Sequence, residues 1–121
     1  TEETTGMCDR EFFAKCRKGS YFVNTSRGEL VDDDALREAL ENGTIVMAGL
    51  DTLDHEPVQK SHPMLSWPEE TKEKILFSPH IGGITGSSFG RGYAMIWEDI
   101  EKISRGEAPG HIVNQKELNR E

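Results

Sequence analysis

The sequence predicts an α/β fold in which helices cover both faces of a parallel sheet. Segments with helical and strand-like patterns alternate along the chain, and such alternation favours parallel strands joined by helices. Residues 44–51 read TIVMAGLD, a continuous apolar run flanked by turn residues. The run is too short for a typical helix, so we predict a strand that is buried on both faces.

The first half of the chain is predicted to form helix, strand, helix and strand. Asp9 is a typical N-cap for a helix over residues 10–17,. The β-rich run SYFVNTS at residues 20–26 follows as the first strand. A second helix begins after Asp32, which is a good N-cap, and ends before Gly43. The apolar stripe expected to face the sheet consists of Ala35, Leu36, Ala39 and Leu40.

The second half begins with an irregular segment and ends in a helix. Three prolines and many charges occur between residues 52 and 74, where Leu65 and Trp67 are the expected anchors to the core,. KILFSPH, residues 74–80, is the third predicted strand. Large apolar residues then keep helical spacing from Tyr93 to Gly106,. The sequence HIVNQ that follows Pro109 is predicted to be an extended tail.

Composition and charge narrow the classes of function. The chain has 121 residues, of which 35% are apolar, and its formal net charge is −8 at pH 7. The basic residues are scattered, so nucleic acid and anionic membranes are poor partners. No apolar run is long enough to span a bilayer, and the sequence TEETTGMCDR at the start lacks the apolar core of a signal peptide,. We therefore expect a soluble, cytoplasmic protein.

Three strands are too few for a stable α/β domain, because parallel strands need neighbours at both edges and helices on both faces. We therefore expect the fold to be incomplete. The two cysteines, Cys8 and Cys16, lie four residues on either side of Phe12. This spacing favours core packing over a redox role, and it matches no metal-binding pair.

Ligands of an open parallel sheet collect outside the carboxyl ends of its strands. Arg27 follows the first strand and is the most informative residue there, because a guanidinium binds a carboxylate through two parallel hydrogen bonds. The alternative is an ion pair with Asp32 or Asp51. Gly28 favours function, since glycine lets the backbone approach a ligand closely.

His80 follows the third strand, and histidine is the side chain best suited to exchanging a proton near neutral pH. Glu56 or Asp54 could supply the carboxylate that fixes its tautomer. The alternative is an ordinary half-buried histidine. We expect the remaining histidines, His55, His62 and His111, to be exposed. We predict no metal site, and the three spaced glycines of a dinucleotide fingerprint are absent from the sequence.

Three motifs in this order resemble the D-isomer-specific 2-hydroxyacid dehydrogenases: FVNTSRGELVDDDALREAL, AGLDTLDHEP and FSPHIGG. The segments TEETTGM and ISRGEAPGHIVN are similar to flanking segments of that family, so the resemblance covers nearly the whole chain. It implies the C-terminal part of a doubly wound, Rossmann-like NAD-binding domain over residues 1–106. Residues 107–121 would then form a tail that returns toward the substrate domain.

The resemblance also implies residue roles. Arg27 would bind the carboxylate and carbonyl of the substrate, His80 would be the acid/base, and Glu56 would be the partner of His80. The residues implied to line the nicotinamide end of the cofactor are Thr25, Ser26, Arg27, Asp51, His80, Gly82 and Gly83.

The implied activity is hydride transfer between NAD, with NADP possible, and a small 2-hydroxy or 2-oxo acid in a homodimer. The sequence departs from the family pattern at Thr52, Leu53 and Asp54, and none of these changes removes a catalytic group. Two rival hypotheses are a nucleotide-sensing or corepressor protein on the same fold, and a fragment that folds by pairing its sheet edge with another copy.

Overall fold

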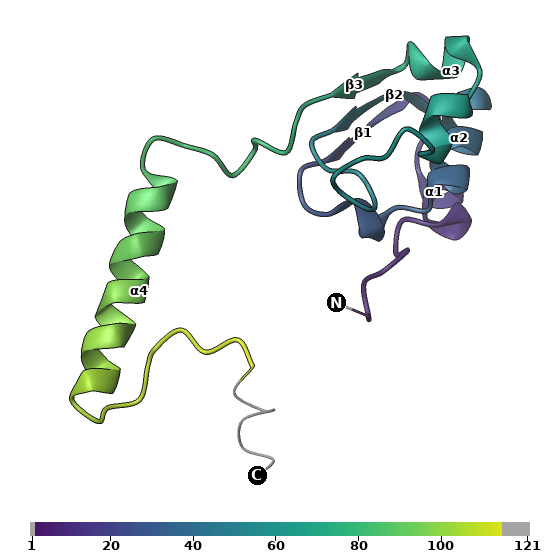
Figure 1. Cartoon of the computed structure of the whole chain (residues 1–121). Helices are drawn as coiled ribbons and strands as arrows, with labels where there is room; N and C mark the ends of the chain where they lie inside the picture. The colour runs from purple at the N-terminus through teal and green to yellow at the C-terminus, as the bar shows by residue number, and fades with distance from the viewer. Residues whose placement is uncertain (1, 115–121) are drawn as a thin grey trace. The chain divides into compact units, whose positions relative to one another are not determined.

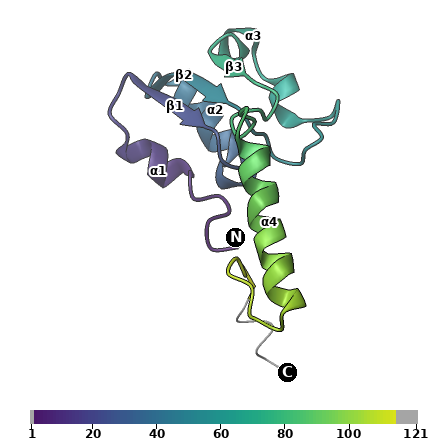
Figure 2. The ribbon, with the colours of Figure 1, turned by 90° about the vertical axis from the view of Figure 1, so that its left-hand side faces the viewer.

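A parallel sheet of three strands, in the order β1-β2-β3, organises the chain. A computed structural model describes residues 2–114. The strands are β1 (Ser20–Asn24), β2 (Ile45–Leu50) and β3 (Ile75–Phe77). They lie side by side in Figures 1 and 2. Both pairings are parallel, which confirms the predicted sheet type.

The helices begin largely where their caps predict. They are α1 (Arg10–Lys15), α2 (Asp33–Glu41), α3 (Glu69–Lys72) and α4 (Ser88–Ser104), together with the 3₁₀ turns η1 (Gly28–Leu30) and η2 (Pro63–Ser66). Asp9 caps α1 by accepting a hydrogen bond from the Phe12 amide at 2.8 Å, and Asp32 caps α2 in the same way at 3.0 Å from the Ala35 amide. Gly43 follows α2 with φ 75°, a conformation that suits glycine and ends the helix,.

The chain forms two compact units, Thr1–Gly82 and Gly83–Glu121. The first contains the sheet, α1, α2 and α3, and the second contains α4. The predicted domain boundary at residue 106 stays a prediction. Within residues 2–114, no helix is long and apolar enough to cross a membrane.

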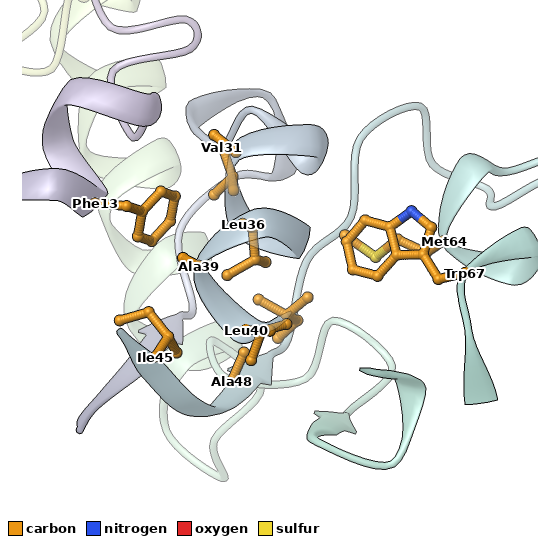
Figure 3. Close-up of a cluster of buried hydrophobic side chains, with 11 residues drawn as sticks. Phe13, Val31, Leu36, Ala39, Leu40, Ile45, Ala48, Met64 and Trp67 are labelled. Carbon is orange, nitrogen blue, oxygen red and sulfur yellow. The ribbon is translucent and has the colours of Figure 1, made fainter. Parts of the chain in front are cut away.

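The core lies between α1, α2 and one face of the sheet, and Met64 of η2 and the nearby Trp67 extend it. Figure 3 shows Phe13 of α1 together with Leu36, Ala39 and Leu40 of α2 near Ile45 and Ala48 of β2. The predicted stripe of α2 is confirmed, because its four residues are all buried. Cys8 and Cys16 are free thiols that pack against this core, as predicted. The buried apolar residues are Phe13, Val31, Ala35, Leu36, Ala39, Leu40, Ile45, Ala48, Leu50, Met64 and Trp67.

Within the first unit, α1 and α2 cover one face of the sheet, and the exposure of Met47 corrects the expectation that β2 is buried on both faces. Ile45, Ala48 and Leu50 of β2 are buried, whereas Met47 is exposed. Other large apolar side chains are exposed on the strands as well, namely Tyr21, Val23, Leu76 and Phe77. The apolar composition of β2 therefore did not distinguish a covered face from an open one.

The segment after β2 is more ordered than predicted, because it contains η2 and α3. Trp67 anchors it to the core, as expected, with 6% of its surface exposed. Leu65 was the wrong second anchor, since 57% of its surface is exposed. Met64, its neighbour in η2, is buried instead, because the 3₁₀ turn directs successive side chains to different sides,.

The second unit consists of α4 and the segment after it. The helix begins at Ser88, five residues before the predicted stripe, and Gly90 and Gly92 lie inside it. No residue of α4 is buried in the part of the chain that the structure describes. Asp99 holds the following segment by accepting the amides of Gly110 at 2.7 Å and His111 at 3.2 Å. Residues 115–121 of the predicted tail lie outside the described residues.

Candidate active site

Three loops follow the carboxyl ends of β1, β2 and β3, and they carry the residues that the sequence singles out. Because the strands are parallel, these ends lie at one edge of the sheet. Arg27 lies three residues beyond β1, Asp51 directly follows β2, and His80 lies three residues beyond β3. All three belong to the first compact unit, as does Glu56.

Glu56 and His80 form the central contact of the site. The Nδ1 atom of His80 lies 2.6 Å from Oε2 of Glu56, and the other carboxylate oxygen accepts the Leu53 amide at 2.9 Å. These hydrogen bonds, first the one with His80 and then the one from Leu53, lower the pKa of Glu56 from its usual value. An ionised Glu56 only accepts hydrogen bonds, so the proton resides on Nδ1 and Nε2 is the nitrogen left for acid/base chemistry.

The structure therefore brings Glu56, rather than Asp54, to His80. Asp54 instead accepts the main-chain amide of His55 at 2.9 Å. His80 is 44% exposed and Glu56 33% exposed at the side chain, so the pair is open to a small molecule.

Asp51 holds the backbone on both sides of His80 through hydrogen bonds. Its carboxylate accepts hydrogen bonds from the Ser78 hydroxyl, from the Ile81 amide at 3.0 Å and from the Gly82 amide at 2.7 Å. The same three bonds, in the order Ser78, Gly82 and Ile81, lower its pKa. The amide of His80 donates to the main-chain oxygen of Asp51 at 2.8 Å. His80 has φ 52°, and this network holds it in a conformation that non-glycine residues seldom adopt,.

This network leaves Asp51 little capacity for the cofactor contact that the resemblance implies. Oδ1 accepts two hydrogen bonds and Oδ2 accepts one, so one acceptor position remains on Oδ2,. A side chain on Gly82 would begin 2.8 Å from that same oxygen, so glycine permits the close approach of the two loops. Contact of Asp51 with a cofactor stays a prediction.

Arg27 is exposed and makes neither of the ion pairs considered for it. Among residues 2–114 its guanidinium has no carboxylate within 4.0 Å, and Nη1 donates to the main-chain oxygen of Ser26 at 2.7 Å. The positive charge contributes to the lowered pKa of Glu56, although less than the hydrogen bonds do. Arg27, Glu56 and His80 line one open pocket of about 230 Å³. The guanidinium is therefore available to an anionic ligand beside the acid/base pair.

Gly28 has a different role from the predicted close approach of a ligand. A Cβ atom at this position would lie 1.9 Å from the carbonyl carbon of Leu53. The glycine is therefore required because two protein loops touch there. Asn24, for which the sequence predicted no individual role, also acts on the Arg27 loop, since its side chain forms hydrogen bonds with the backbone of Ser26 and Arg27. An asparagine that directly follows an apolar run and precedes a turn is the signal that could have identified it.

The remaining cofactor-lining predictions are Thr25, Ser26, Gly82 and Gly83, and they stay predictions. Thr25 and Ser26 are exposed, so a ligand could reach them. No cluster of three or more His, Cys, Asp or Glu side chains suited to a metal ion occurs within the described part of the chain.

His62 corrects the expectation that the other histidines are exposed. It is buried, its Nδ1 accepts the Met64 amide at 3.3 Å, and its Nε2 lies 3.8 Å from a carboxylate oxygen of Asp33. Burial raises the pKa of Asp33, and His62 opposes that shift. His55 and His111 are exposed, as predicted.

Comparison with protein families identifies a match over residues 1–82 to the NAD-binding domain of D-isomer specific 2-hydroxyacid dehydrogenases. A glyoxylate reductase from Korarchaeum cryptofilum is 35% identical over 116 residues, which are 96% of this chain and 33% of the relative. Human glyoxylate reductase/hydroxypyruvate reductase is 40% identical over 85 residues, or 70% of this chain and 24% of the relative. The chain thus spans about a quarter to a third of the length of these curated relatives.

Solved structures show the same relationship. The D-isomer specific 2-hydroxyacid dehydrogenase of Xanthobacter autotrophicus Py2, in complex with NADPH and MES, has a TM-score of 0.72 and 32% identity, covering 94% of this chain and 43% of that chain. D-lactate dehydrogenase from Lactobacillus jensenii with NAD+ has a TM-score of 0.71 and 30% identity, covering 95% of this chain and 37% of that chain. These matches confirm the predicted fold as part of a Rossmann-like, NAD-binding domain.

Proposed function

We propose, because the chain belongs to the D-isomer specific 2-hydroxyacid dehydrogenase family, that the full-length protein transfers hydride between NAD or NADP and a small 2-hydroxy or 2-oxo acid. The relatives named glyoxylate reductase and hydroxypyruvate reductase favour short 2-oxo acids as substrates. The observation that carries the proposal is the 2.6 Å contact between His80 and Glu56 in the pocket that Arg27 also lines.

His80 is proposed to move the proton. In the reduction direction its protonated Nε2 donates to the oxygen on carbon 2, and in oxidation the same nitrogen accepts the hydroxyl proton. Glu56 stabilises the positive imidazolium and holds Nδ1 protonated in both directions. Asp51 supports the step indirectly, because its hydrogen bonds hold the backbone on both sides of His80.

Arg27 is proposed to bind the acid. Its guanidinium has no ion-pair partner among residues 2–114, and a substrate carboxylate would supply one through two parallel hydrogen bonds,. Such binding places carbon 2 beside His80 and brings a positive charge near the oxygen that becomes negative during reduction. Glu29, Thr52 and Leu53 also line this pocket.

The exposed residues at the edge of the sheet fit the nicotinamide end of NAD. Thr25 and Ser26 follow β1 and are exposed, and Gly82 has no side chain to fill the space near Thr25. NAD, when bound, supplies or accepts the hydride at carbon 2. The homodimer and the cytoplasmic location stay predictions.

The test is an assay of the full-length protein with glyoxylate and hydroxypyruvate, in which the absorbance of NADH or NADPH is followed. His80→Ala is expected to lower kcat by about 10² to 10⁴-fold, the usual contribution of general acid catalysis. His55→Ala is the matched control, because that imidazole is exposed and lies 3.3 Å from Asp54 rather than against Glu56. Near-normal turnover of the His80 variant would refute the role of His80, and a wild-type protein that reduces no 2-oxo acid would refute the activity.

A further inference from the structure

The loop that carries Arg27 is held from inside by one buried amide. Asn24 is the last residue of β1 and only 6% of its surface is exposed. Its Oδ1 accepts the Ser26 amide at 3.0 Å, and its Nδ2 donates to the main-chain oxygen of Arg27 at 2.8 Å. Its own main-chain oxygen accepts the Asp51 amide at 2.9 Å. The side chain thus joins β1 to two successive points of the loop.

These two bonds need a carboxamide. A carboxamide offers one acceptor and a pair of donor hydrogens, whereas an ionised carboxylate only accepts and an alanine does neither. Thr25, Ser26 and Arg27 are all exposed, so no buried apolar side chain holds the loop in place. The backbone between β1 and η1 is therefore held by the Asn24 side chain at its start and by the contact of Gly28 with the Leu53 backbone at its end.

The same loop also restrains the guanidinium. Nη1 of Arg27 donates to the main-chain oxygen of Ser26 at 2.7 Å, while the amide of Ser26 is bound by Asn24. Both main-chain polar groups of Ser26 are therefore occupied, one by the Asn24 side chain and one by the arginine. A rotation of this loop would move the Ser26 oxygen that binds the guanidinium, and Arg27 would then point away from the pocket.

We propose that Asn24 is a positioning residue for Arg27, which sets the direction of the guanidinium toward the substrate carboxylate without touching the substrate. The inference rests on the proposed function for its kinetic consequence. Loss of both hydrogen bonds is expected to raise KM for the 2-oxo acid about tenfold, because each bond contributes on the order of 1 kcal/mol to the ordered loop. The KM for NADH is expected to stay within about twofold.

The test uses the full-length protein with Asn24→Ala, Arg27→Gln and the double variant. If Asn24 acts through Arg27, the Asn24→Ala change raises KM for glyoxylate about tenfold alone and less than about twofold in the Arg27→Gln background. Asn42→Ala is the matched control, because its Oδ1 accepts the Thr44 amide at 2.8 Å in a similar turn at the end of α2. We expect it to leave both KM values unchanged.

Equal increases of KM in the two backgrounds would overturn the proposal, as would a lowered Tm with unchanged KM. If Asn24→Ala does not fold, Asn24→Asp takes its place, since it keeps the acceptor for the Ser26 amide and loses the donor to Arg27. Amide hydrogen exchange separates this inference from the proposed function. This measurement applies even if the wild-type protein proves inactive. A Ser26 amide that is protected in the wild-type protein and exchanges in Asn24→Ala would support the role of Asn24 in holding the loop. A Ser26 amide that is already unprotected in the wild-type protein would overturn that role.

Discussion

Replacement of Gly28 by alanine places a methyl group where two loops of the site touch. Gly28 directly follows Arg27, and the backbone of Leu53 and Asp54 lies against it. The new Cβ would lie 1.9 Å from the Leu53 carbonyl carbon and 2.1 Å from the Asp54 nitrogen. Both neighbours are backbone atoms, so no side chain can turn away to make room.

The size of the effect follows from these distances. Cβ atoms essentially never approach another heavy atom more closely than 3.0 Å, so the loops must separate by at least 1.1 Å, the difference between 3.0 Å and 1.9 Å. Arg27 lies on one loop, and the Leu53 amide that binds Glu56 lies on the other. A misplacement of about 1 Å costs about 10²-fold in rate, so kcat/KM is expected to fall about 100-fold, or about 2.7 kcal/mol of transition-state stabilisation.

The assay compares kcat/KM for glyoxylate in the wild-type protein, in Gly28→Ala and in Gly49→Ala, with Tm measured for each. Gly49 lies in β2, and a Cβ there would be 3.8 Å from Val23, an ordinary van der Waals distance. We expect the control to keep wild-type kcat/KM. A folded Gly28→Ala protein with kcat/KM within about threefold of wild type would refute the argument that the loop contact sets the distance between Arg27 and the acid/base pair.

The remaining predictions concern the charged residues and the core. In steady-state kinetics, Arg27→Gln is expected to raise KM for the 2-oxo acid and to lower kcat by about 10²-fold or more. A variant with a changed Tm but unchanged KM and kcat would contradict the role of Arg27 in binding the substrate. Glu56→Gln keeps an acceptor for His80 but removes the negative charge that stabilises the imidazolium. The rate of 2-oxo acid reduction is therefore expected to fall more at about pH 8 than at about pH 6. An equal loss of rate at both pH values would count against this reasoning. The pKa of Glu56 is lower in the folded protein than in the unfolded chain. The ionised carboxylate therefore stabilises the fold at pH values above its unfolded pKa, and this contribution is lost as the pH falls through its folded pKa. Measurement of Tm as a function of pH in the acid range would detect the loss. Trp67→Ala is expected to cost about 3–5 kcal/mol in urea unfolding, whereas Leu65→Ala, at an exposed site, is expected to cost less than about 0.5 kcal/mol.

Helix caps and glycine stops predicted the helices well, because each of these signals depends on contacts between residues a few positions apart. The caps Asp9 and Asp32 and the stop at Gly43 depend on hydrogen bonds and φ values of single helix ends. The choice between Leu65 and its neighbour Met64 depends instead on how a 3₁₀ turn meets the core, and periodicity does not determine that.

The same distinction applies to the candidate site. Arg27 and His80 could be predicted because ligands of parallel sheets collect after the strand ends. The choice of Glu56 over Asp54 could not be reached from spacing, and it came only from the resemblance, because both carboxylates lie in one irregular loop. The structure separates them, since only Glu56 has its carboxylate 2.6 Å from the imidazole.

The contacts that build the site are short and connect neighbouring strand ends. Asn24 holds the loop after β1, Asp51 holds the loop after β3, and Glu56 joins the loop after β2 to His80. Each bond joins residues within the first unit, so the strand ends and the loops that follow them set the geometry of the acid/base pair. The acid/base pair lines two pockets of different character, because Arg27 and Glu29 contribute charges to one of about 230 Å³, whereas Val58 and Phe77 contribute apolar surface to one of about 550 Å³. The imidazole of His80 therefore lies between a charged region and an apolar region of the same unit.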